Sequence, residues 1–169
     1  MANRLTIGVV GAGGDGVVVL GSFLQRLTAS QGYFSSMPRY YGAQIRGGGS
    51  AIKLSLDGET VPVPRDSLDI LVSLDWDKYL ELRRELALTA YTVVLYEKEP
   101  PAQVELPGSS FQIAFSRASQ EATGSARDKN ILALGLLTRL LGLPQDRVKN
   151  DIAEDHKLHL VKELSLIHI

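Results

Sequence analysis

The feature that most restricts the fold of this chain is an apolar run that ends in a cluster of glycines. Residues 5–10 have the composition of a β-strand, the turn Gly11-Ala-Gly-Gly-Asp-Gly16 follows, and an apolar helical stretch begins at Val17. Side-chain-free positions in such a turn permit close approach of the backbone to a phosphate, and the N–H groups that begin the helix favour an anion there. The glycines concerned are Gly11, Gly13, Gly14 and Gly16. The pattern predicts a strand–turn–helix unit of the nucleotide-binding kind.

The remainder of the dinucleotide-binding pattern is missing. A dinucleotide fold has Asp or Glu about 20 residues after the turn, where the carboxylate binds the ribose hydroxyls. Residues 31–41 contain no carboxylate, and Arg39, which could suit a 2′-phosphate, does not follow a clear strand. Two interpretations of the turn therefore stay open beside anion binding. The chain could be an independent NAD(P)-binding Rossmann oxidoreductase, or the glycines could serve close packing alone.

A thiamine-diphosphate site is also incomplete. Gly14-Asp-Gly16 matches the opening of the thiamine motif, in which Asp and a later Asn hold a divalent metal through oxygen ligands. The chain's asparagines, at positions 3, 130 and 150, do not stand where that motif needs one. His156 and His159 are three residues apart but have no evident third ligand, so we expect no metal site in this chain.

Composition excludes several classes of protein. The 18 basic and 19 acidic side chains nearly balance, so the chain has no net positive charge that would attract nucleic acid or an anionic membrane. No apolar run approaches the ~20 residues that span a bilayer. The chain has no cysteine, so it offers no disulfide, thiolate nucleophile or cysteine ligand for an iron–sulfur cluster. We expect a cytoplasmic protein with a single domain over residues 1–169, and truncation at its C-terminus is left open.

Strands and helices alternate along the chain. The helix after the glycine turn carries an apolar stripe in which Gly21 would allow close approach to the sheet. Asp57-Gly58 predicts a hairpin turn into a return strand over residues 59–63. Further strands are expected over residues 51–56, 69–74, 91–96 and 111–116, and helices over 76–88, 129–141 and from 146 onward. The order predicts an α/β fold, a three-layer α/β/α Rossmann-like sandwich with a mixed, mainly parallel sheet.

A second glycine cluster stands in the segment Tyr41-Gly-Ala-Gln-Ile-Arg-Gly-Gly-Gly-Ser50. Consecutive glycines cost chain entropy unless the backbone needs their freedom. Successive amides in such a bend can form an anion-binding concavity, which a guanidinium would reinforce. The candidate residues are Arg46, Gly47, Gly48, Gly49 and Ser50. The alternative is a loop that enters the next strand with Arg46 in solvent.

Taken in order, these motifs resemble the gamma subunit or gamma domain of the 2-oxoacid:ferredoxin (acceptor) oxidoreductases, which include the pyruvate, 2-ketoisovalerate, 2-oxoglutarate and indolepyruvate enzymes. The resemblance covers roughly residues 4–142. It rests on the two glycine segments, Pro-x-Pro at 62–64, the strand at 69–74 and Asn130-Ile-Leu-Ala-Leu-Gly135. Asp15 stands where many members carry Gln or Glu, and the chain ends sooner than a typical gamma domain.

The resemblance implies one component of a larger complex that decarboxylates a 2-oxoacid, possibly 2-oxoglutarate or pyruvate. Other subunits or domains would bind thiamine diphosphate with Mg²⁺ and the iron–sulfur clusters, ferredoxin or another acceptor would take the electrons, and coenzyme A would take the acyl group. These thiamine-binding and iron–sulfur chains are the expected partners. We assign no catalytic residue to this chain. Its two glycine segments are expected to meet at one rim of the sheet, facing a phosphate-bearing cofactor or a partner chain.

Overall fold

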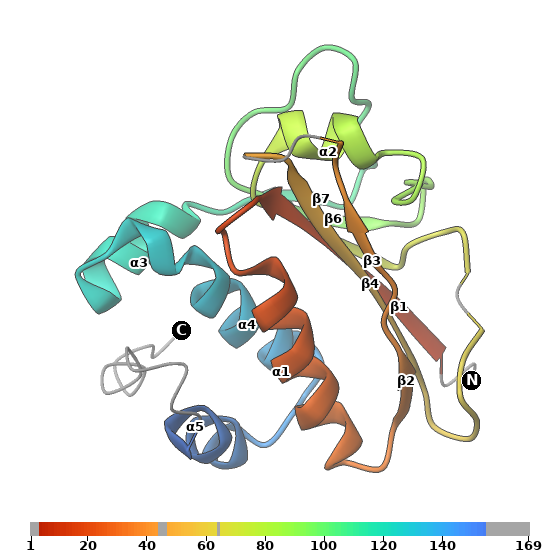
Figure 1. Cartoon of the computed structure of the whole chain (residues 1–169), viewed down its shortest axis with the longest axis vertical. Helices are drawn as coiled ribbons and strands as arrows, with labels where there is room; N and C mark the ends of the chain where they lie inside the picture. The colour runs from red at the N-terminus through yellow and green to blue at the C-terminus, as the bar shows by residue number, and fades with distance from the viewer. Residues whose placement is uncertain (1–3, 44–46, 64, 155–169) are drawn as a thin grey trace.

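The computed structural model describes residues 4–43, 47–63 and 65–154, and within them the chain forms one mixed sheet (Figure 1). The strands are β1 (Arg4–Ala12), β2 (Phe34–Ser36), β3 (Arg39–Tyr41), β4 (Gly49–Asp57), β5 (Ile70–Ser73), β6 (Val93–Tyr96) and β7 (Ser110–Gln112). The helices are α1 (Val17–Ala29), α2 (Trp76–Leu82), α3 (Phe115–Thr123), α4 (Lys129–Leu140), α5 (Gln145–Glu154) and the short 3₁₀ helix η1 (Ala126–Asp128).

The sheet order is β2-β4-β1-β5-β6-β7, with β3 also paired to β4. β1 runs parallel to β5, which runs parallel to β6, and β6 to β7. β4 is antiparallel to each of its neighbours β1, β2 and β3, so the sheet changes direction on both sides of this strand. This arrangement confirms the α/β class and the mixed, mainly parallel sheet.

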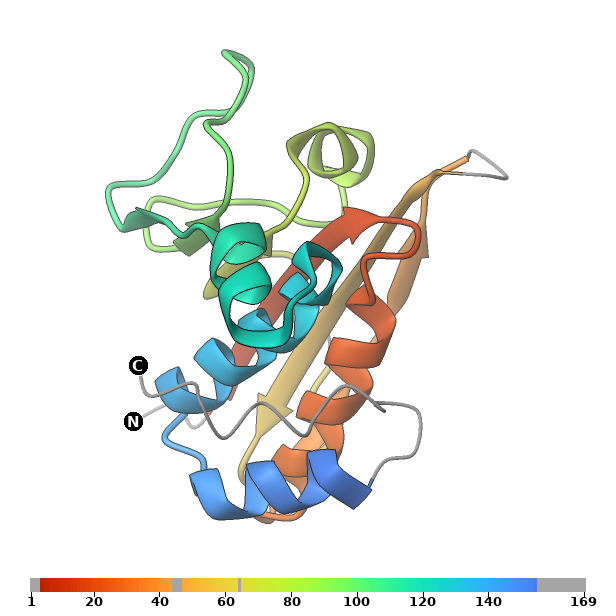
Figure 2. The same ribbon diagram turned by 90° about the vertical axis from the view of Figure 1, so that its left-hand side faces the viewer.

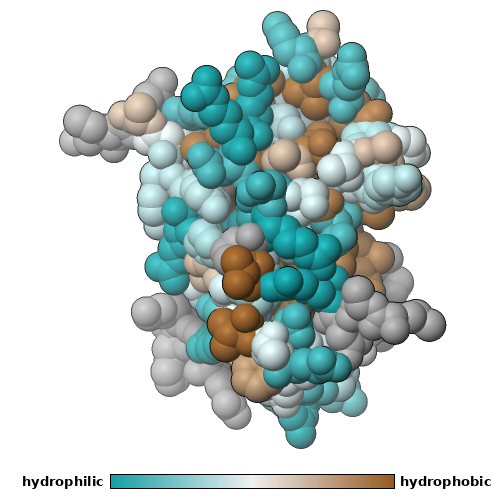
Figure 3. All heavy atoms as spheres, turned by 90° about the vertical axis from the view of Figure 1, so that its right-hand side faces the viewer, coloured by the Kyte–Doolittle hydropathy of each residue, from teal (hydrophilic) through white to brown (hydrophobic). Residues whose placement is uncertain are grey.

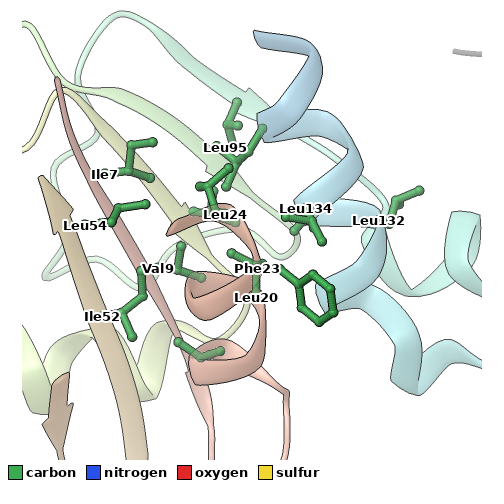
Figure 4. Close-up of a cluster of buried hydrophobic side chains, with 14 of the residues drawn as sticks. Ile7, Val9, Leu20, Phe23, Leu24, Ile52, Leu54, Leu95, Leu132 and Leu134 are labelled. Carbon is green, nitrogen blue, oxygen red and sulfur yellow. The ribbon is translucent and has the colours of Figure 1, made fainter. Parts of the chain in front are cut away.

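One face of the sheet is covered by α1 and α4, which lie together on the same side of β1 in Figure 1. Figure 4 shows Ile7, Val9, Ile52 and Leu54 on the strands, with side chains of α1 and α4 opposite them. Each of these strand side chains is fully buried. Burial of a large aliphatic side chain contributes about 1.5–3 kcal/mol, so this layer supplies most of the core.

The other face is covered by a thinner layer made of α2 and the loops around it. Trp76, Tyr79 and Leu82 of α2 are buried against residues of β1, β4, β5 and β6. Figure 3 looks at the right-hand side of Figure 1 and shows a mostly hydrophilic surface with small hydrophobic clusters. The three-layer arrangement is therefore present, with unequal outer layers. No helix in the described ranges is long and apolar enough to cross a membrane.

Gly21 confirms its expected role in bringing α1 close to the sheet. A Cβ at this position would lie 2.7 Å from Met37 Sδ and 3.1 Å from Ile52 Cδ1. These distances are shorter than ordinary van der Waals contact, so a larger residue would push α1 away from β4.

The predicted hairpin at Asp57-Gly58 is wrong. Asp57 Oδ1 accepts hydrogen bonds from Glu59 N at 2.9 Å and Thr60 N at 3.3 Å, which turns the chain out of the sheet. β1 occupies one edge of β4, and β2 and β3 occupy the other, so β4 has no edge left for a return strand. Residues 58–63 form no strand.

Three other element boundaries differ from expectation. α2 ends at Leu82 rather than at 88, and the strand expected over 111–116 divides into β7 and the start of α3. The segment over residues 34–41, where no clear strand was expected, contributes β2 and β3. The last helix begins at Gln145, and the expectations for His156, His159 and the C-terminal end lie outside the described residues.

Candidate functional site

The two glycine segments meet at the carboxyl end of β1. Gly13 N donates a hydrogen bond of 2.9 Å to Gly48 O. Gly42 N donates one of 2.8 Å to Gly49 O, where the loop that connects β3 and β4 begins and ends. In Figure 2 the turn between β1 and α1 lies beside the end of this hairpin. The expected convergence is therefore present among the described residues, whereas Arg46 lies outside them.

Between the two segments lies an open cleft of about 490 Å³. Its walls are the glycine turn, the first turn of α1 and the loop end of the β3–β4 hairpin. The lining residues are Ala12, Gly13, Gly14, Gly16, Val17, Val18, Val19, Tyr41, Gly42, Gly47, Gly48, Gly49 and Ser50. Gly11 lies just behind this wall, where a Cβ would meet Asp15 Oδ2 at 2.8 Å. Most of this surface is backbone and small apolar side chains, so the cleft is suited to binding rather than to acid–base chemistry.

The backbone of the first turn requires glycine at Gly16. This residue has a φ of 71°, in the left-handed region, and a Cβ there would overlap the side-chain amide of Asn130 on α4. Gly13 differs, because among the described residues the only atom within 4 Å of a Cβ built there is Gly48 O, at 3.2 Å. A side chain at Gly13 would therefore enter the cleft and press on the opposite segment.

Within the described ranges, the start of α1 beside the cleft has no side-chain cap. Gly16 is the N-cap and supplies no side-chain acceptor, and the first turn of α1 contains no acidic residue. The first N–H groups of an α-helix have no intrahelical partner, and the helix dipole adds partial positive charge there. Together with the glycine backbone, this end of α1 favours an anionic group such as a phosphate.

Asp15 fixes the turn rather than facing a ligand. Its Oδ2 accepts a 2.8 Å hydrogen bond from Ala12 N and forms a 3.0 Å ion pair with Lys129 Nζ at the start of α4. The aspartate of the Gly14-Asp-Gly16 motif is thus already bonded within the chain. The described residues contain no group of three or more acidic or histidine side chains that could hold a metal ion. Because Asp15 is engaged by Ala12 N and Lys129, it does not fit the metal-binding aspartate of a thiamine site.

Two side chains that support the cleft were missed by sequence reasoning. Lys129 neutralises Asp15, and Glu81 of α2 accepts a hydrogen bond of 3.0 Å from Gly49 N. Both stand far along the chain from the glycine segments they support, and neither belongs to a recognisable local pattern. Only the folded arrangement reveals them.

Comparison with protein families gives one match over most of the chain. The model of the pyruvate ferredoxin/flavodoxin oxidoreductase family matches residues 6–163. The chain is 30% identical over 147 residues to the 2-oxoglutarate synthase subunit KorC of Methanocaldococcus jannaschii, covering 83% of this chain and 76% of KorC. The chain therefore belongs to the pyruvate ferredoxin/flavodoxin oxidoreductase family.

Two solved structures share the fold of this chain. The 2-oxoglutarate:ferredoxin oxidoreductase of Magnetococcus marinus, solved with 2-oxoglutarate, coenzyme A and succinyl-CoA bound, superposes with a TM-score of 0.78 at 23% identity, over 90% of this chain and 27% of that one. The keto/oxoacid ferredoxin oxidoreductase gamma subunit of Geobacter sulfurreducens PCA gives a TM-score of 0.69 at 20% identity, over 95% of this chain and 91% of that one.

Its relative KorC is named as a subunit of a 2-oxoglutarate synthase, and the Geobacter sulfurreducens gamma subunit shares its fold. The resemblance inferred from the glycine motifs is thereby confirmed. None of the relatives reported above is named as a nucleotide-dependent dehydrogenase, so the NAD(P)-binding alternative gains no support.

Proposed function

We propose that this chain serves a complex that oxidatively decarboxylates a 2-oxoacid, and that its glycine cleft binds coenzyme A through the phosphate groups. The observation that carries the proposal is the meeting of the two glycine segments around an uncapped helix start. Backbone N–H groups and close backbone approach suit a diphosphate, which presents several anionic oxygens within a short distance. Coenzyme A is also named among the molecules bound to the Magnetococcus marinus relative.

Thiamine and redox chemistry belong, in this proposal, to partner chains. This chain has no cysteine for an iron–sulfur cluster, and Asp15 is already bonded to Ala12 N and Lys129. Coenzyme A supplies the thiol that accepts an acyl group. The part of this chain is to hold and orient its phosphates beside the reaction centre. We propose 2-oxoglutarate as the 2-oxoacid to test first, because KorC is named as a 2-oxoglutarate synthase subunit.

The direct test is purification of the tagged chain with the proteins that accompany it, followed by titration with coenzyme A. We expect co-purifying thiamine-binding and iron–sulfur chains, and 2-oxoacid-dependent reduction of a viologen dye that needs coenzyme A. Gly13→Val should weaken coenzyme A binding at least tenfold, since its side chain enters the cleft. Gly108→Val is the matched control, because a Cβ at Gly108 meets no atom of the described residues within 4 Å and Gly108 does not line the cleft.

The alternatives make different predictions in the same experiment. Binding of NAD(P)H in place of coenzyme A, lost in Gly13→Val, would support an independent dehydrogenase. Coenzyme A binding that is unchanged in Gly13→Val would show that the cleft is not the phosphate site. A stable monomer without partner chains would contradict the proposal that this chain serves a 2-oxoacid-decarboxylating complex.

A further inference from the structure

The peptide group between Gly48 and Gly49 is held at both ends. Its carbonyl oxygen accepts the 2.9 Å hydrogen bond from Gly13 N, and its N–H donates the 3.0 Å hydrogen bond to Glu81 Oε2. The first contact joins the two walls of the cleft, and the second joins the same peptide to α2. Because a peptide group is planar, fixing its N–H also fixes the direction of its carbonyl.

Glu81 also packs against both sides of the β3–β4 hairpin at its loop end. A Cβ at Gly42 would overlap the Glu81 carboxylate, and a Cβ at Gly49 would lie 3.0 Å from Glu81 Oε2. These two glycines form the hydrogen-bonded pair that closes the hairpin. Glycine at both positions therefore leaves room for the Glu81 carboxylate to reach the backbone.

The charge of Glu81 is balanced within α2. Lys78 Nζ lies 3.5 Å from Glu81 Oε2, with side-chain exposures of 17% and 25% for the lysine and the glutamate. Because Lys78 neutralises it, the Glu81 carboxylate can accept the hydrogen bond from Gly49 N without repelling an anion in the cleft on the other side of the hairpin. The carboxylate acts here as a hydrogen-bond acceptor rather than as a ligand.

From this arrangement we infer that Glu81 is a positioning residue for the glycine cleft: it sets the orientation of the Gly48–Gly49 peptide and thereby the distance between the two walls. This inference rests on the proposed binding of coenzyme A for its kinetic consequence. Its structural consequence, the bond from Gly13 to Gly48, does not depend on the identity of the ligand.

The test compares Glu81 variants in the complex purified with its partner chains. Glu81→Ala removes the acceptor, and we expect the KM for coenzyme A to rise about tenfold while kcat stays within twofold, as for one lost charge-assisted hydrogen bond. Glu81→Gln keeps an oxygen acceptor and should remain within about threefold of the unmodified complex. If Glu81→Ala does not assemble, Glu81→Asp tests the same point, because its carboxylate is one methylene too short to reach Gly49 N.

The matched control is Glu121→Ala, which removes an exposed carboxylate that pairs with Arg117 on α3. Amide hydrogen exchange at Gly13 and Gly49 gives a second, ligand-free measurement, and it should accelerate in Glu81→Ala but not in Glu121→Ala. Unchanged exchange at Gly13, an unchanged KM in Glu81→Ala and Glu81→Asp, or no rescue by Glu81→Gln would overturn the inference. If the unmodified complex does not use coenzyme A, the proposed function fails and the exchange measurement alone decides the role of Glu81.

Discussion

Replacement of Gly16 by alanine should destabilise the protein through two separable effects. Gly16 has a φ of 71°, and a residue with a Cβ loses about 1–2 kcal/mol in the left-handed region. The new Cβ would also overlap the side-chain amide of Asn130, which must leave its position at a cost of about 0.5–1.5 kcal/mol. The expected loss in the free energy of unfolding is therefore about 1.5–3.5 kcal/mol.

A double-mutant cycle separates the two effects. In the Asn130→Ala background the overlap disappears, so Gly16→Ala should then lose only the backbone contribution of about 1–2 kcal/mol. Gly14→Ala is a matched control: Gly14 also has a positive φ, of 101°, but a Cβ there would meet no described atom within 4 Å. Its effect should be the same with or without Asn130.

Urea denaturation of the isolated chain measures these differences. The single tryptophan, Trp76, is buried on α2, so its fluorescence reports loss of the sheet-facing core. Equal losses for Gly16→Ala in both backgrounds would show that Asn130 does not contact the turn. A loss below about 0.5 kcal/mol would refute the left-handed conformation itself, because that conformation alone costs more.

Three further predictions concern groups outside the first turn of α1. Lys129→Met should lower the free energy of unfolding by about 1–3 kcal/mol by leaving the half-buried Asp15 carboxylate unpaired, and Asp15→Asn in the same chain should restore part of it, as urea denaturation would measure. Ser73→Ala should raise that free energy by about 0.5–1 kcal/mol, because the Ser73 hydroxyl is buried without a hydrogen-bond partner in the described part of the chain; a clear loss would show that it has one. Hydrogen bonds from the N–H groups of Glu59 and Thr60 lower the pKa of Asp57 from 3.8, so its contribution to stability is present above that pH and is lost as the pH falls through the folded-state pKa. The Asp57→Asn variant should therefore lose less stability in acid than the unmodified chain does. Thermal unfolding measured at several pH values checks this difference.

The sequence predicted the elements whose signals are local. β1, the glycine turn and α1 follow one another without a gap, and each has the composition that its conformation requires. The close approach at Gly21 could also be predicted, because a glycine within an apolar helical stripe removes a side chain at the position that faces the sheet. The convergence of the two glycine segments followed from the resemblance, which supplied a reason for them to share one rim.

The errors arose where one local signal had two outcomes. Asp57-Gly58 is a common hairpin turn, but the same aspartate can accept hydrogen bonds from the next two N–H groups and direct the chain outward. Which outcome occurs depends on whether the edge of β4 is free, and β2 and β3 occupy it. Those strands are three residues each, too short for a periodic signal. The pairing of β2 and β3 with β4 therefore determines that residues 59–63 form no return strand, which the local sequence could not show.

The structure also bears on whether the glycines serve packing alone. Packing accounts for Gly16, Gly42 and Gly49, because a Cβ at each would press on Asn130 or Glu81. In the part of the chain that the structure describes, packing does not account for Gly14, where a Cβ would meet no atom within 4 Å. Nor does it account for a helix that begins without a side-chain cap or an acidic residue. A cap of Ser, Thr, Asp or Asn at such a helix start is worth about 0.5–2 kcal/mol, so leaving it uncapped forgoes stability. An anion that supplies the missing acceptor, beside a backbone left open at Gly14, gives both features one cause, and it favours a phosphate-binding cleft over packing as the reason for the first glycine cluster.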